Sequence, residues 1–172
     1  MSEETATAET LPDRARRAFR SHDSLSDPED GAAAVTSTPF DASVAAVPGE
    51  AGAIRFRVTV TVPWLSDVVE GELADVVEDG WADTFRRRVE SIGAVTEGDH
   101  DLTPTVEETD AGLVTTATLS DLDHRRGTND AVAVVDYVEG TYVQGVIPGY
   151  DYTDPVAGLI QSARAAGGSE GL

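Results

Sequence analysis

All four tyrosines of the chain fall within one short segment, Tyr137–Tyr152. A phenol combines an apolar ring with a hydroxyl that needs a hydrogen-bond partner when it is buried. The segment therefore predicts either a pocket that stacks a flat ligand or grips a peptide, or a packed loop anchored by tyrosines after a helix. Packing is the favoured interpretation, because buried aromatic rings usually serve the core. The candidate contact residues are Tyr137, Glu139, Tyr142, Gln144, Tyr150, Asp151 and Tyr152.

Two carboxylates, Asp136 and Glu139, stand three residues apart in a mostly apolar stretch. On a shared desolvated face such a pair would have separated pKa values, as acid–base catalysis requires. A solvated polar stripe is the commoner outcome of this spacing. We therefore assign no catalytic residue and favour a protein without catalytic activity, with an enzyme kept as an alternative.

The three histidines, His22, His100 and His124, lie too far apart in sequence to form a local metal pair. The clusters Asp99–Asp101 and Asp121–His124 each combine a histidine with carboxylates, but 32 Asp and Glu residues produce such clusters by chance. Motifs such as Gly-x-Ser-x-Gly and His-Glu-x-x-His do not occur. The sequence predicts neither a dedicated metal site nor a cofactor.

All 12 basic residues are arginines, and many are clustered. If folding gathered the clusters, they would form a basic patch for nucleic acid or an acidic partner, with candidate contacts Arg14, Arg17, Arg86 and Arg87. Pairing with nearby carboxylates is the favoured interpretation, since the net charge is -20. Nucleic acid is not the favoured partner, because salt weakens phosphate contacts severely.

Length and composition limit the class of protein to which these residues belong. A chain of 172 residues suits one domain, and the lack of cysteine excludes disulfides and thiolate sites. A net charge of -20 without lysine is typical of a halophile, whose concentrated salt screens the carboxylates. No signal peptide or membrane span is evident, so a cytoplasmic protein is expected.

Hydrophobic periodicity predicts the elements that must position these residues. Alternation is clearest over Ile54–Val62, which predicts a strand buried on one face. The expected helices lie within 11–22, 73–92 (one helix or two), 130–144 and after Pro155, where Val156, Leu159, Ile160 and Ala163 form a buried stripe. The expected strands lie within 33–38, 40–46, 54–62, 104–108 and 113–119.

The fold class is therefore α+β, in the order α-βββ-α-ββ-α-α. We expect a single domain over residues 11–166, with a largely antiparallel sheet of five strands covered by helices on one face. Residues 1–10 are expected to be a disordered acidic tail, and residues 167–172 a frayed end.

Several segments resemble an uncharacterised family of small haloarchaeal proteins, a domain of unknown function. The segments are Leu11–Phe19, Thr38–Ala42, Val76–Trp81 (VVEDGW) and Tyr137–Tyr152 (YVEGTYVQGVIPGYDY). The resemblance implies a halophilic cytoplasmic protein and carries over no catalytic residue.

The resulting functional hypothesis is a non-catalytic protein-binding or adaptor domain, with an unidentified protein partner or self-association as a homodimer. A domain that binds a small ligand, or an enzyme, using Tyr137–Tyr152 is the first alternative. Nucleic-acid binding through the arginine clusters is the second.

Overall fold

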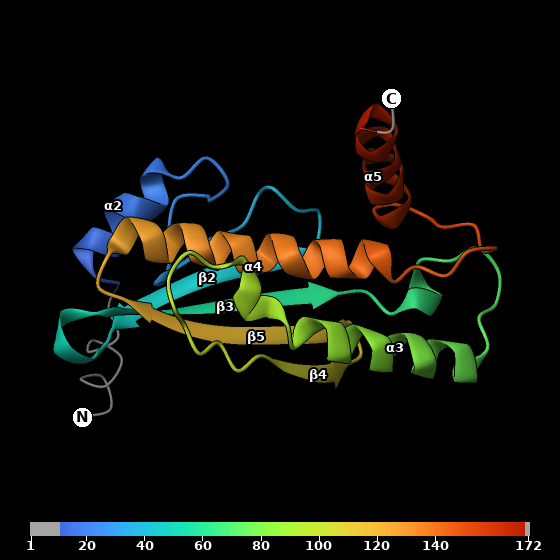
Figure 1. Ribbon diagram of the computed structural model, residues 1–172, viewed down its shortest axis with the longest axis horizontal. Coiled ribbons are helices and arrows are strands. Elements are labelled where there is room, and N and C mark those ends of the chain that lie inside the picture. The colour runs from blue at the N-terminus through green and yellow to red at the C-terminus, as the bar shows by residue number, and fades with distance from the viewer. Residues whose placement is uncertain (1–10, 171–172) are drawn as a thin grey trace.

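The computed structural model describes residues 11–170 and contains a five-stranded sheet in the order β1-β2-β3-β5-β4 (Figure 1). Every pair of neighbouring strands is antiparallel. The predicted sheet and the predicted order of helices and strands are confirmed, whereas the predicted tail 1–10 lies outside the described residues. The strands are β1 Ala32–Ala34, β2 Asp41–Pro48, β3 Ile54–Val62, β4 Thr105–Thr109 and β5 Gly112–Asp121.

The central strand β3 shows why only one face of the sheet is covered. Phe56 and Val58 are buried, whereas Arg55 and Arg57 between them are exposed. Successive side chains of a strand point to opposite faces, so the apolar set packs under the helices and the arginines face outward. The alternation predicted from the sequence is confirmed.

Four α-helices accompany the sheet in the described part of the chain: α2 Asp13–Ser21, α3 Asp75–Val89, α4 His124–Gln144 and α5 Val156–Glu170. The longest, α4, runs along the sheet and packs on β3 and β5, while α2 packs against α4 (Figure 1). Short 3-10 turns occur at Glu50–Gly52, Leu65–Asp67 and Ile92–Val95.

Helix α4 begins at His124, six residues before the predicted start at Asp130. The carboxylate of Asp123 caps it by accepting the backbone N–H groups of Arg125 at 2.9 Å and Arg126 at 3.1 Å. The early turns are mostly polar and bury Gly127 and a threonine rather than large apolar side chains. They therefore lack the apolar rhythm from which the helix was predicted.

Two other helices differ from the expectation in instructive ways. Helix α3 is continuous through Gly80, which faces open space, so residues 75–89 form one helix rather than two. Among residues 156–166 of α5 only Val156 is fully buried; Leu159 and Ile160 are half-buried and Ala163 is exposed. The predicted buried stripe was wrong beyond the first turns, because α5 projects away from the sheet (Figure 1). The expected frayed end, 167–172, lies partly outside the described residues and stays a prediction.

Both edges of the sheet are protected. Strand β1 is shorter than the predicted 33–38, and a preceding segment bonds along its outer side, with Ser26 N–H donating to Ala34 O at 2.9 Å and Glu29 N–H to Ala32 O at 2.8 Å. The opposite edge, β4, carries exposed carboxylates at Glu107 and Glu108. Neither edge offers a long, bare apolar strand.

Candidate functional site

The structure places the tyrosines of the segment Tyr137–Tyr152 in packing positions. Tyr142 is fully buried, with its ring against Phe40 and Trp81 at centroid distances of 5.0 and 5.5 Å. Its hydroxyl donates to Pro63 O at 3.1 Å. The hydroxyl of Tyr137 donates to the main-chain oxygen of Arg88, and that of Tyr152 donates to the oxygen of Ile147 and accepts its N–H.

These tyrosines and their expected polar partners do not converge on one cavity. Tyr137 and Gln144 share a hollow of about 430 Å³ between α3 and α4. Tyr150 lines a separate hollow beside Glu72, and Asp151 is exposed. Hydroxyls bonded to the main chain favour structural roles for Tyr137, Tyr142 and Tyr152 over contact with a ligand.

The carboxylate pair Asp136 and Glu139 occupies a partly desolvated stripe of α4. Burial raises the pKa of Glu139 above its usual range, opposed by a hydrogen bond from Thr38 and reinforced by the charge of Asp136. Burial likewise raises the pKa of Asp136, opposed by His22. One oxygen of Glu139, Oε1, is buried without a hydrogen-bond partner. Glu139 is half-buried whereas Asp136 is exposed, so only part of this stripe is desolvated, and nothing beside it identifies a substrate.

The predicted basic patch is not assembled as a single surface. Arg14 donates to the main-chain oxygens of Gly52 at 2.7 Å and Leu122 at 3.1 Å, beyond the end of β5. Arg86 pairs with Glu108, which faces the start of β5. A ten-residue strand separates these two points by roughly 30 Å. Arg14 and Arg17 therefore lie at one end of the sheet, and Arg86 and Arg87 at the other.

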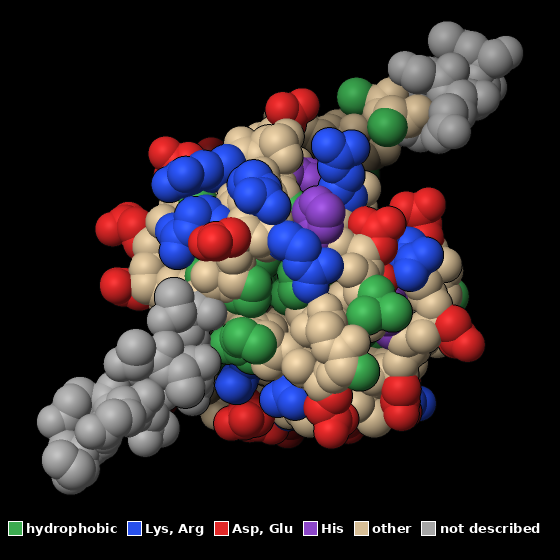
Figure 2. All heavy atoms as spheres, turned by 90° about the vertical axis from the view of Figure 1, so that its left-hand side faces the viewer, with side chains coloured by type: hydrophobic (Ala, Val, Ile, Leu, Met, Phe, Trp, Pro, Cys, Tyr) green, Lys and Arg blue, Asp and Glu red, His purple; other side chains and the backbone are tan. Residues whose placement is uncertain are grey.

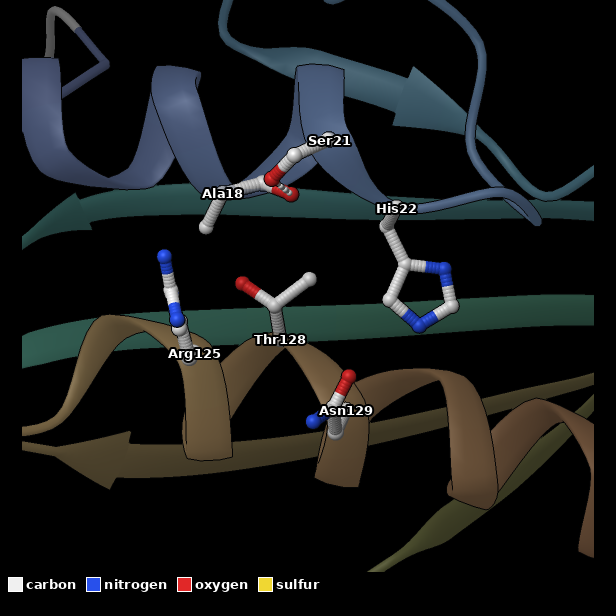
Figure 3. Close-up of a pocket in the computed structure, with 6 residues that line it drawn as sticks. All are labelled: Ala18, Ser21, His22, Arg125, Thr128 and Asn129. Carbon is white, nitrogen blue, oxygen red and sulfur yellow. Dashed lines mark hydrogen bonds between the residues drawn. The ribbon is translucent and has the colours of Figure 1, made fainter.

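Helix α2, which carries four of the arginines, lies next to the start of α4 (Figure 3). A hollow of about 330 Å³ separates the two helices, and Figure 3 shows the residues that line it. The imidazole of His22 accepts the N–H of Ser24 at Nδ1, 3.1 Å away, and points across the hollow toward Asn129. The lining residues are Ala18, Ser21, His22, Arg125, Thr128 and Asn129.

We call the arginines at this end the basic face: Arg14, Arg16, Arg17 and Arg20 of α2 and Arg125 of α4. The α2 members fill the arc opposite its buried residues. Within residues 11–170 none of the five forms an ion pair, so the expected pairing with nearby carboxylates is not found among the residues that the structure describes. Figure 2 shows arginine side chains gathered on this end of the molecule, with histidine among them.

A buried polar cluster was missed from the sequence. His100, Asp121 and Asp130 come together from the loop before β4, the end of β5 and the second turn of α4. The Arg126 guanidinium donates two hydrogen bonds of 2.8 Å to Asp121 and holds the pKa of that carboxyl below its usual range. The acidic segments around His100 and Asp121 were the available signal, but only the fold shows that they meet.

No helix in the described residues is long and apolar enough to cross a membrane. Curated proteins and solved structures give no match to this chain. The profile of a family of unknown function, DUF5813, matches residues 20–162. That range includes the segments Val76–Trp81 and Tyr137–Tyr152, whereas Leu11–Phe19 lies before it. The chain therefore belongs to DUF5813, a family of unknown function.

Proposed function

We propose that this protein is a non-catalytic binding domain whose basic face holds a carboxylate-rich segment of a partner protein. One observation carries the proposal. The chain has 32 Asp and Glu residues against 12 arginines, yet five arginines at one end have no carboxylate partner within residues 11–170. What sets these five arginines apart is their position, since they gather at one end of a strongly acidic chain (Figure 2).

The chemistry of the face suits carboxylates. A guanidinium presents a planar set of donors that matches a carboxylate in two parallel hydrogen bonds. Arg14 fixes α2 through two main-chain oxygens, which keeps the other arginines of this helix in place. The hollow between α2 and α4 adds His22 and Asn129 as further hydrogen-bonding groups.

A short protein segment fits this face better than nucleic acid does. The whole chain carries a net charge of -20, so a long polyanion would meet carboxylates on either side of the face. A short acidic segment contacts the arginines alone. In the salt-rich cytoplasm that we infer from the composition, long-range attraction is screened, and short bidentate contacts supply the recognition.

Fluorescence anisotropy with a labelled octaglutamate peptide tests the proposal, at a KCl concentration at which circular dichroism shows the folded chain. The double variant Arg17→Glu/Arg125→Glu should weaken binding by about tenfold, or 1.4 kcal/mol. The matched variant Arg88→Glu/Arg164→Glu changes the net charge equally at exposed arginines outside the face. It should keep the affinity within about twofold.

Three outcomes would contradict the proposal. Equal losses in both double variants would show that only net charge matters. Tighter binding of an RNA or DNA oligomer of equal charge would favour the nucleic-acid alternative. The third outcome is an unsubstituted chain that binds no peptide but forms a dimer in analytical ultracentrifugation. If the Arg17→Glu/Arg125→Glu variant is then monomeric, the basic face serves self-association.

A further inference from the structure

The cluster of His100, Asp121 and Asp130 lies outside the basic face and has a chemistry of its own. The three side chains are 5%, 1% and 2% exposed. Buried ionisable groups are costly unless each has a partner of opposite charge or a metal ion. With Arg126 the two carboxylates still leave one negative charge, which a bound cation would balance.

Its ligand atoms are spaced as they would be around one metal ion. The Nε2 atom of His100 lies 2.9 Å from Oδ2 of Asp130 and 3.6 Å from Oδ2 of Asp121. Metal–nitrogen and metal–oxygen bonds of about 2.1 Å place neighbouring ligand atoms about 3.0–3.4 Å apart. All three atoms also lie within 4.8 Å of one another. Small side-chain movements would bring them to bonding distance from a common centre.

Both carboxylates are oriented by groups outside the cluster. Asp130 accepts the N–H of Glu97 at Oδ1, 2.8 Å away, and the N–H of Gly98 at Oδ2, 3.0 Å away. Asp121 accepts the two hydrogen bonds from Arg126. Such outer partners are what keep metal-binding carboxylates in position.

Gly98 allows this arrangement, because a Cβ atom there would stand 2.4 Å from Nε2 of His100. Access comes from a hollow of about 420 Å³ that His100 lines together with Glu90, Asp101 and Thr103. Carboxylates at such an opening attract cations, and water there can complete the coordination. Ligands, outer partners and an entry path are thus all present, which is what a metal site requires.

We propose that His100, Asp121 and Asp130 bind one divalent transition-metal ion, in the class of Zn²⁺, Mn²⁺ or Co²⁺. A mixed imidazole and carboxylate set suits these ions better than Mg²⁺ or Ca²⁺, which take oxygen ligands alone. The ion takes the place of a proton shared between His100 and the two carboxylates. Its bonds to the three side chains connect the loop before β4 to α4 and β5. The proposal is independent of the basic face.

Co²⁺ and Zn²⁺ are the probes, added to the full chain after dialysis against a chelator. Calorimetry should give one ion per chain, with visible absorption bands for Co²⁺ and weaker binding of Mg²⁺. His100→Gln and Asp130→Asn should each lower the affinity by about tenfold or more. The matched control His124→Gln removes a histidine outside the cluster and should leave the affinity unchanged.

A measurement on the unsubstituted chain keeps the test decisive should either variant unfold. Zn²⁺ should shift the Nε2 resonance of His100 in a long-range ¹H–¹⁵N spectrum and leave those of His22 and His124 in place. No saturable binding at about 1 mM metal would overturn the proposal. So would binding that shifts no His100 resonance, and either result would assign the cluster to a proton-held ion network.

Discussion

The ring of Phe56 on β3 occupies the space in which a side chain on Gly127 of α4 would stand. A Cβ atom at Gly127 would lie 2.3 Å from Cε1 and 2.7 Å from Cζ of this fully buried ring. The start of α4 therefore approaches the sheet more closely than any residue other than glycine permits. This contact fixes the helix that contributes Arg125 and Asp130 to the two proposed sites.

Gly127→Ala should destabilise the chain by about 1–3 kcal/mol, because a methyl group there overpacks the core against Phe56. Gly140→Ala is the matched control on the same helix, where an added Cβ meets nothing within 4 Å. That change should stabilise the chain by about 0.5–1 kcal/mol through helix propensity. Urea denaturation of both variants measures the difference, and a stabilising Gly127→Ala would show that the contact is misplaced.

Phe56→Ala should lower the free energy of unfolding by about 3–5 kcal/mol, because it leaves a cavity beneath α4. Arg57→Ala on the opposite face should cost less than about 0.5 kcal/mol, since that side chain is exposed. Chemical denaturation checks both values. A loss below about 1 kcal/mol for Phe56→Ala would mean that the covered face of β3 is assigned backwards.

Tyr142→Phe separates a structural from a ligand-binding role for the tyrosine segment. Removing the hydroxyl leaves the partly buried Pro63 O without this partner and should cost about 1–2 kcal/mol. Tyr150→Phe, at a half-buried ring, should change stability by less than about 0.5 kcal/mol. Thermal melts compare the two variants. Equal, negligible effects would reopen the possibility that Tyr142 serves a bound molecule.

Glu139→Gln should raise the melting temperature at pH 7 and lose that advantage in acid. Burial raises the pKa of Glu139 in the folded chain, so its ionised form is disfavoured there relative to the unfolded chain. Stability is therefore full below the ordinary value of 4.5 and falls as pH rises through the folded pKa. The neutral amide avoids this loss and can still bond Thr38.

Melting curves from pH 3 to pH 8 measure this effect. Glu72→Gln is the charge-matched control at an exposed position, and its small effect should come from overall repulsion alone. If the two variants respond to pH in the same way, the burial of Glu139 does not govern its ionisation.

The parts of the fold that could be predicted from the sequence are those governed by local periodicity. The alternation of Phe56 and Val58 with Arg55 and Arg57 predicts a strand with one face in the core and the other in solvent. The burial of side chains along β3 alternates in this way over the whole strand. The strands predicted at 104–108 and 113–119 lie at nearly the observed positions of β4 and β5, which pair with each other. Both signals lie within a few neighbouring residues.

What could not be predicted depends on contacts between distant residues. The polar start of α4 is helical because Asp123 caps it and Gly127 fits against Phe56, which no apolar rhythm reveals. Ala163 is exposed because α5 projects away from the sheet, although its spacing matches a buried stripe (Figure 1). His100 and Asp121 each stand in an acidic segment of ordinary appearance, and only the loop, strand and helix together make them neighbours.

The protection of both sheet edges affects whether copies of the chain can associate at high concentration. On one side the stretch before β1 occupies the hydrogen-bonding groups of Ala32 and Ala34; on the other, Glu107 and Glu108 repel any strand that carries the same charges. Within residues 11–170 the two edges of the sheet thus leave no long, unpaired apolar strand to which a second copy could add its own strands.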